Sequence, residues 1–268
     1  MANLASTYRN QGRWKEAEEL DVHVMETSAM VLGSEHPDTL TSMANLASTY
    51  MNQGRWKEAE ELEVQVIETR KRVLGSEHPD TLASMANLAS TFWNRERWKE
   101  AEELDVQVIE TRKRVLGSEH PDTLTSMANL ASTYRNQGRW EEAEELEVQV
   151  MKMRKRVLGS EHPDTLTSIA NLASTYRNQG RWKEAGELNV QVTTTRKRVL
   201  GSEHLSTLTS MNNLAFTFKF QGRNDEAISL MKKCVQLRKQ VLGHQHPHTT
   251  SSLEALNTWQ MENMVIED

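Results

Sequence analysis

The stretch Met43–Ser84, MANLASTYMNQGRWKEAEELEVQVIETRKRVLGSEHPDTLAS, decides the fold of this chain, because nearly all of the remaining sequence repeats it. Further copies begin at Met1, Met85, Met127, Ile169 and Met211, which gives six units with a period of 42 residues. The second and fourth copies differ at only six positions. A period in this range is typical of solenoids, in which each unit packs on its neighbours. We therefore expect six tandem repeats over residues 1–252, with residues 253–268 forming the end of a capping helix and a tail.

Composition and charge argue against several classes of protein. The net charge of -6 is spread evenly over the repeats, so no segment resembles a nucleic-acid-binding surface. Basic runs such as Arg112–Arg114 fall in the last turn of a predicted helix, where the helix dipole favours positive charge. No apolar run has the length of a membrane span, and the N-terminus lacks a secretory signal. We expect a cytoplasmic protein that binds neither nucleic acid nor membranes.

Each unit contains two helical patterns. The first, helix A, extends from Pro79 to about Asn94, with Leu82, Met85 and Leu88 on one apolar side. Helix B follows a Gln-Gly-Arg turn and stops near a glycine, and its apolar side holds Trp56, Ala59, Leu62 and Val66. The short connections require consecutive helices to pack antiparallel. One helix pair cannot bury both apolar sides alone, so neighbouring units must cover them.

The ends and the irregular copies lead to further expectations. The first copy lacks the Pro-Asp-Thr-Leu turn, so we expect the chain to begin inside a helix A. At the other end, one more helix A from Pro247 to about Met264 is expected to cap the last pair. Cys234 replaces a valine of the other copies and should be a core residue. Local fraying is expected where the repeat departs from its pattern, at Glu96, Leu205 and Asn224.

The spacing of Leu46-Ala47, Tyr50, Gly54, Trp56 and Ala59 resembles the tetratricopeptide repeat. The period, the Gln-Gly-Arg turn and the Val-Leu-Gly-x-x-His-Pro connector are similar to the kinesin light chain type of this repeat, which is also common behind nucleotide-binding signalling modules in fungi. This resemblance implies an all-α, right-handed superhelical solenoid of stacked antiparallel helix pairs. It also implies a protein–protein interaction scaffold rather than an enzyme.

No catalytic motif is present, and we expect no cofactor. The sequence has no Walker loop, GxSxG, HExxH or Cys-x-x-Cys. One histidine per unit stands before helix A, at His36, His78, His120, His162 and His204, where capping of the helix explains it. His244, His246 and His248 alternate in a loop without partner ligands, and we expect no metal site there.

The candidate binding surface lies on helix A. The third residue of each 42-residue unit falls on the side of helix A opposite the apolar side. These residues should form a ladder along the concave groove: Asn3, Asn45, Asn87, Asn129, Asn171 and Asn213. An amide offers a donor and an acceptor, which suits an extended peptide backbone, and kinesin light chains use such a ladder for cargo peptides. The alternative is that these amides bond to each other or to the next helix. Asn52, Asn94, Asn136 and Asn178 extend the same face.

The ninth residue of each unit varies beside the ladder. It is Arg9, Met51, Trp93, Arg135, Arg177 and Lys219 in the six copies. Trp93 is suited to hold an apolar side chain, and Arg135, Arg177 and Lys219 would favour an acidic segment. Drift after a recent duplication explains the same variation without any function.

Two polar residues interrupt the apolar side of helix B in each unit. Glu63 and Arg70, like Asp105 and Arg112, are seven residues apart and too distant to bond directly. We expect each to find a partner across a helix interface, and we expect the partner of Arg112 to be a carboxylate.

The sequence therefore predicts a non-catalytic scaffold that binds a protein or peptide in the groove lined by helix A. The alternative is a structural, self-assembling or sensor arm of a larger signalling protein, with weak self-association through the truncated N-terminal end.

Overall fold

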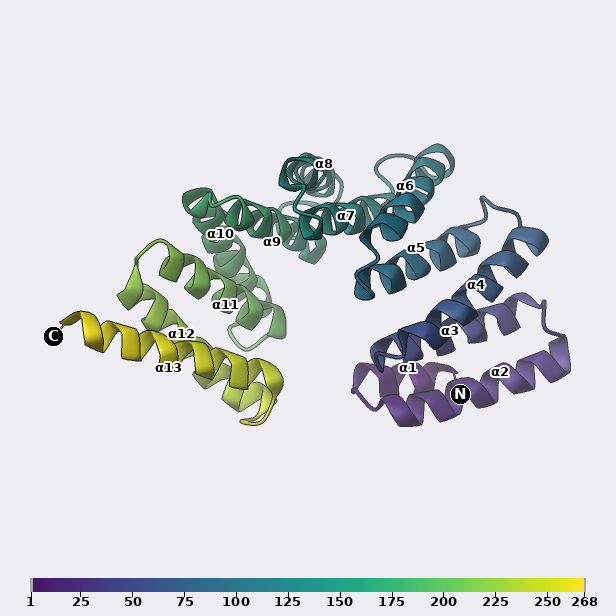
Figure 1. Ribbon diagram of the computed structural model, residues 1–268, viewed down its shortest axis with the longest axis horizontal. Coiled ribbons are helices and arrows are strands. Elements are labelled where there is room, and N and C mark those ends of the chain that lie inside the picture. Colours follow the sequence, from purple (N-terminus) through teal and green to yellow (C-terminus); the bar gives the residue numbers. More distant parts are fainter. Residues whose placement is uncertain (1, 268) are drawn as a thin grey trace. The chain divides into compact units, whose positions relative to one another are not determined.

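The computed structural model describes residues 2–267, and this part of the chain is all-helical, with thirteen helices and no strand. The helices follow one another with short loops between them (Figure 1): α1 (Ala2–Asn10), α2 (Trp14–Leu32), α3 (Pro37–Asn52), α4 (Trp56–Val73), α5 (Pro79–Asn94), α6 (Trp98–Val115), α7 (Pro121–Asn136), α8 (Trp140–Leu158), α9 (Pro163–Asn178), α10 (Trp182–Leu200), α11 (Leu205–Phe220), α12 (Asn224–Leu242) and α13 (Pro247–Glu267). The predicted helix A over 79–94 is confirmed. Helix B also begins where it was predicted.

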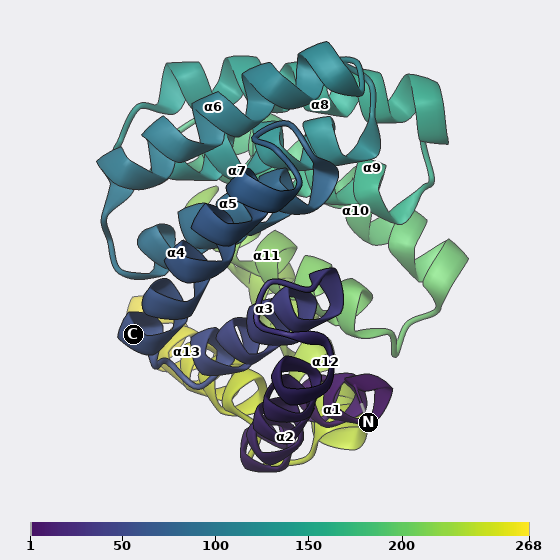
Figure 2. The same ribbon diagram turned by 90° about the vertical axis from the view of Figure 1, so that its right-hand side faces the viewer.

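The chain forms two compact units, residues 1–138 with α1–α7 and residues 139–268 with α8–α13. Within each unit every helix packs on the helix before it and the helix after it. In the first unit the odd-numbered helices also contact one another, α1 with α3, α3 with α5 and α5 with α7. Figures 1 and 2 show these helices stacked pair upon pair. The two-layer solenoid expected from the repeat is confirmed within each unit.

Each odd-numbered helix from α3 to α11 begins with the same side-chain cap. In α3, His36 Nδ1 accepts a hydrogen bond from the backbone N–H of Asp38 at 3.2 Å, and Pro37 occupies the first helical position. Thr39 Oγ1 donates to the carbonyl of Gly33 at 2.8 Å, which ties the new helix to the end of α2. These bonds satisfy groups that a helix start leaves free. The capping role predicted for the connector histidines is confirmed.

The turn from α3 to α4 needs a left-handed residue, which Gly54 supplies with a φ of 76°. The third repeat has Glu96 there, and it adopts the same conformation, with a φ of 58°. Arg55 then lies over the Tyr50 ring at 4.0 Å, and the equivalent Arg97 lies over Phe92 at 4.2 Å. The helices next to Glu96, Leu205 and Asn224 keep the bounds of the other repeats, so the expected fraying is not seen.

A buried arginine on each even-numbered helix from α4 onward fixes the start of the next helix. Arg112 is 7% exposed and donates to the backbone carbonyl of Asp122 at 3.0 Å and to Ser126 Oγ at 2.7 Å. The same geometry recurs one period away in each direction, at Arg70 and Arg154. The expected partner across a helix interface is therefore present, but the prediction of a carboxylate was wrong. The groups that Arg112 meets at the start of the next helix are a backbone carbonyl and a serine hydroxyl.

Glutamate side chains on the even-numbered helices, called the outer helices from here on, bind arginines of the next turn. Glu18 accepts from Arg55 Nη1 at 2.6 Å, and Glu144 accepts from Arg181 Nη1 at 2.7 Å. In the fifth repeat this glutamate is replaced by Gly186, which is buried. Gly186 lines an open cavity of about 760 Å³ together with Trp182, Gln221, Arg223 and other residues. Trp56, expected in the core, is 38% exposed because it stands at the first residue of α4, beside the turn.

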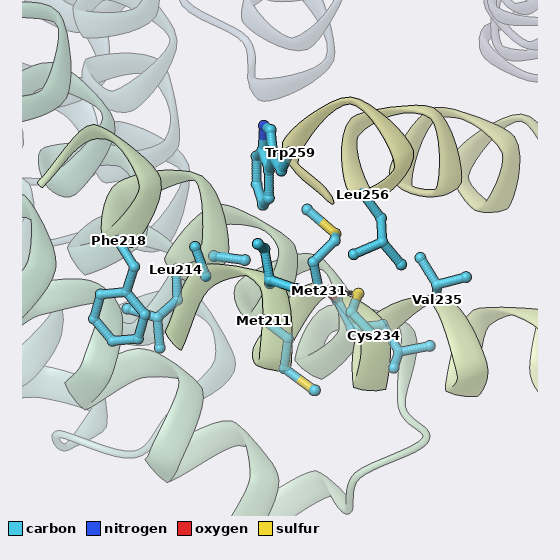
Figure 3. Close-up of a cluster of buried hydrophobic side chains, with 12 residues drawn as sticks. Met211, Leu214, Phe218, Met231, Cys234, Val235, Leu256 and Trp259 are labelled. Carbon is cyan, nitrogen blue, oxygen red and sulfur yellow. Dashed lines mark hydrogen bonds between the residues drawn. The ribbon is translucent and has the colours of Figure 1, made fainter. Parts of the chain in front are cut away.

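The last helix completes the core of the second unit. Leu256 and Trp259 of α13 lie over Met231 and Cys234 of α12 and Met211 of α11 (Figure 3). Trp259 meets Phe216 edge to face, with ring centroids 5.0 Å apart. Both the capping helix and the core position of Cys234 are confirmed. The helix continues to Glu267, three residues past the predicted end.

Candidate functional site

The six ladder asparagines lie on the side of helix A that turns away from its buried apolar residues. In α3 the buried apolar residues are Leu40, Met43, Leu46 and Ala47, and Asn45 points away from them, on the side of the buried polar residues Ser42 and Thr49. All six side chains are exposed or half-buried. None of these side-chain amides forms a hydrogen bond with another residue in the described part of the chain. The predicted alternative, in which these amides bond to each other, is therefore not found among residues 2–267.

Other polar side chains of helix A are used locally. Ser48 Oγ donates to the carbonyl of Ala44 at 3.0 Å, and Thr49 Oγ1 donates to the carbonyl of Asn45 at 3.2 Å. Asn52 and Asn94, predicted to extend the ladder face, each donate to a serine carbonyl four residues earlier at 2.8 Å. Asn136 and Asn178 are exposed at the ends of α7 and α9. The ladder amides, which are unbonded, thus differ from the bonded side chains of Ser48, Thr49, Asn52 and Asn94.

The ninth residues contact other parts of the chain. Arg9 pairs with Asp21 at 2.7 Å, and Lys219 Nζ pairs with Glu262 at 2.7 Å. Arg135 donates to Ser132 Oγ at 3.3 Å, and Arg177 is half-buried. Trp93 meets Trp98 edge to face, with centroids 5.8 Å apart, and its indole nitrogen is buried without a hydrogen bond. The preference for an acidic segment stays a prediction, but Lys219 already has an acidic partner.

A cavity of about 280 Å³ lies within the first unit, between α5, α6 and α7. It is lined by residues that include Trp93, Asn94, the ladder residue Asn129, Thr133 and the buried carboxylate Asp105. The amide groups and Trp93 were predicted as site residues, whereas Asp105 was treated only as half of a structural pair. The sequence carried a signal for it, because Trp93 replaces the arginine that serves the equivalent carboxylate in the first copy.

Asp105 is 2% exposed, and its Oδ1 atom accepts no hydrogen bond from the described residues. Burial raises the pKa of Asp105 to about 7, and the nearby Arg112 lowers it only in part. Burial likewise raises the pKa of Glu63, the equivalent residue in the second repeat, to about 7, although Thr91 donates a hydrogen bond to it. Two carboxyl groups in the first unit are therefore held in an environment that disfavours their charge.

The histidine-rich loop before α13 does not gather metal ligands. His246 Nδ1 accepts the backbone N–H of His248 at 3.2 Å, as the other connector histidines do for their helices. Among the described residues no three His, Cys, Asp or Glu side chains are grouped to hold a metal ion. No helix within residues 2–267 is both long and apolar enough to cross a membrane.

Comparison with known proteins identifies the family. Residues 1–38, 39–80, 81–122 and 123–164 match one tetratricopeptide repeat family, and residues 164–240 match another. The chain therefore belongs to the tetratricopeptide repeat proteins, whose members are typically interaction scaffolds. Its repeats are of the kinesin light chain type, because they resemble nearly identical tetratricopeptide-like repeats of a Podospora anserina kinesin light chain protein. The crystal structure of that protein is 38% identical in sequence to this chain and has a TM-score of 0.66. The match covers 77% of this chain and 98% of the Podospora chain.

More distant structures share the fold. BtubC from P. vanneervenii is 18% identical, with a TM-score of 0.72 over 87% of this chain and 94% of its own. A Rap protein complexed with competence and sporulation factor is 11% identical, with a TM-score of 0.62 over 97% of this chain and 74% of its own. The comparison with curated proteins gives no match.

Proposed function

We propose that the chain is a non-catalytic, cytoplasmic scaffold that binds a protein segment along the free side of its odd-numbered helices. The observation that supports this proposal is the unbonded row of third-position amides. Asn45, Asn87 and Asn129 repeat at one period within the first unit, and each presents a donor and an acceptor that no described residue uses. A peptide backbone offers both kinds of group at regular intervals.

The supporting contrast is with the other side of each repeat. Polar groups on the outer helices and in the turns are largely consumed by the structure, as in the bonds from Gln179 and Arg181 to Glu144 at 2.9 and 2.7 Å. A ligand there would have to displace these internal contacts. The ladder face requires no such displacement, so its amides are available at little cost in stability.

The test uses a peptide selected against the intact chain from a random library. Changing Asn45, Asn87 and Asn129 together to Ala should weaken its binding by about 2 to 3 kcal/mol, at roughly 1 kcal/mol for each lost hydrogen bond. Helicity should stay unchanged because these side chains are not in the core. Calorimetry measures the affinity, and circular dichroism measures the helicity.

The matched control removes three amides from the outer helices, Gln65, Gln107 and Gln149, whose side chains are exposed. Glu102 and Glu144 would be unsuitable as controls, because they accept hydrogen bonds from Gln137 and Gln179 of the next turn and their loss would perturb the fold. Loss of binding in this control with retention in the ladder variant would place the ligand on the outer helices. A mass that rises with protein concentration in sedimentation, without peptide binding, would favour the self-assembling alternative.

A further inference from the structure

The first repeat shows how this fold binds a guanidinium group. Arg9 Nη1 lies 2.7 Å from Asp21 Oδ2, 3.3 Å from the carbonyl oxygen of Asn45 and 3.3 Å from Thr49 Oγ1. One carboxylate, one carbonyl and one hydroxyl thus surround the cation, and Thr49 Oγ1 also donates to the carboxylate at 2.6 Å. The carboxylate is only 2% exposed, so the charge pair is largely removed from water.

Two periods further on, the same three acceptors recur without the arginine. The residues 84 positions after Asp21, Asn45 and Thr49 are Asp105, Asn129 and Thr133, and all three line the cavity of about 280 Å³. The residue equivalent to Arg9 is Trp93, which lines the same cavity. The third repeat therefore has the acceptors that hold a guanidinium in the first repeat, and it replaces the internal cation with an aromatic ring.

We propose that this cavity binds the side chain of an arginine carried by the peptide, an inference that rests on the proposed peptide-binding function. The buried Oδ1 atom of Asp105 accepts no hydrogen bond from a described residue, whereas Arg112 on the same helix already donates to Asp122 and Ser126. An incoming guanidinium supplies the cation that Asp105 lacks. It forms a charge-assisted hydrogen bond in a place where water competes little.

The aromatic residue specifies more of the ligand. An indole face attracts a guanidinium plane, so Trp93 adds to the binding that Asp105 provides. Its buried indole N–H has no acceptor within the described residues, and a guanidinium has only donors. A backbone carbonyl beside the arginine meets this need, and the ladder amide of Asn129 lies on the same cavity wall. The ligand is therefore an arginine within a peptide rather than a free cation.

The size of the cavity agrees with a single side chain. Pockets that enclose whole small molecules usually measure about 300 to 1,000 Å³, and this one lies just below that range. An acidic side chain in the same place would meet the Asp105 carboxylate. This part of the groove therefore selects a basic residue, in contrast to the acidic preference predicted from Arg135, Arg177 and Lys219.

The experiment uses an acetylated and amidated Gly-Arg-Gly peptide with the intact chain, and the same peptide with citrulline as an uncharged comparison. Binding is followed by the NMR signal of the Trp93 indole N–H, assigned by its loss in Trp93→Phe, and by calorimetry. We expect the arginine peptide to shift this signal saturably. The citrulline peptide should bind at least tenfold more weakly.

Two variants test the residues. Asp105→Asn should weaken binding of the arginine peptide at least tenfold, and Trp93→Arg should abolish it by placing an internal guanidinium in the cavity. Glu103→Gln removes the same charge from the exposed side of α6 and should leave the affinity unchanged. Equal binding of the two peptides, unchanged binding to Asp105→Asn or no binding to the original chain would overturn the inference. If a library-selected peptide still depends on the ladder in that case, the proposed function stands without it.

Discussion

The first and third repeats bury the same carboxylate in two different ways. Asp21 is paired with Arg9 at 2.7 Å, whereas Asp105, equally buried, faces a cavity beside Trp93. The sequences around the two residues are nearly identical, so the difference follows from one substitution on the neighbouring helix. A repeat in which the arginine is present is internally complete, and one in which it is absent keeps a carboxyl group open to a partner. Small changes between copies can therefore separate structural repeats from binding repeats.

The largest effect should come from removing the arginine of the first repeat, which the second and third repeats lack. Arg9→Met leaves Asp21 buried without its cation, and we expect the free energy of unfolding to fall by about 3 kcal/mol. Urea unfolding followed by circular dichroism measures the loss. The double variant Arg9→Met with Asp21→Asn should recover most of it, because the unpaired charge is gone. A loss below about 0.5 kcal/mol would mean that Asp21 reaches water, and the comparison would fail.

The effect of the unpaired carboxyl group of Asp105 on the free energy of unfolding should depend on pH. Because burial raises the pKa of Asp105 to about 7, the folded chain keeps a proton that the unfolded chain releases above about pH 4. The stability contribution of this group is therefore lost as the pH rises from about 4 to 7. Asp105→Asn should raise the free energy of unfolding at pH 8 by on the order of 2 kcal/mol and change it little at pH 4.

Asp21→Asn is the matched variant for this measurement, and it should destabilise the chain at pH 8 because it removes the partner of Arg9. Urea unfolding at pH 4 and pH 8 measures the sign of the change in the free energy of unfolding for each of the two variants. The same sign for both variants would show that the two carboxylates are equivalent after all, and would remove the basis for an open site at Asp105.

The smallest effect concerns a third kind of departure, in which a side chain is missing altogether. Gly186 is the fifth residue of α10, and Gly186→Ala should raise the free energy of unfolding by about 0.5 to 1 kcal/mol through helix propensity. A Cβ atom there would lie 2.6 Å from the Nε2 atom of Gln221, at the far end of a flexible side chain that can turn aside. Thermal unfolding measures the gain. A decrease would show that the bond from Gln221 to the Trp182 carbonyl matters more than the helix.

The sequence predicted most of the fold because each repeat carries its own boundaries. His78 and Pro79 start α5, and the glycine turn ends the helix A of most copies, so the helix limits follow from local chemistry. Fraying at Glu96 was wrong because the helices on both sides of the turn hold this residue in a left-handed conformation. Local preference was weaker there than the packing on either side of the turn.

The site was only partly predictable. The ladder amides and Trp93 follow from helical periodicity, but their state of bonding depends on which atoms meet between helices. Arg112 illustrates the difficulty, since its place on the helix indicated a buried partner without identifying the carbonyl of Asp122. The missing partner of Asp105 is evident only from the position of Arg9 beside Asp21 in the first repeat. Periodicity gives the direction of a side chain, and only the structure gives its partner.

The hydrogen bonds that arginines form between helices have a consequence for how the chain folds. Arg70 reaches Asp80 and Ser84, 10 and 14 residues ahead, and Arg9 reaches Thr49, 40 residues ahead. Contacts that close over such short distances form quickly, because little chain entropy is lost in bringing their ends together. During synthesis, an interface of this kind is complete as soon as one further repeat has left the ribosome. The time needed to fold each repeat should therefore depend on the rate of translation, and lengthening the array should not slow it.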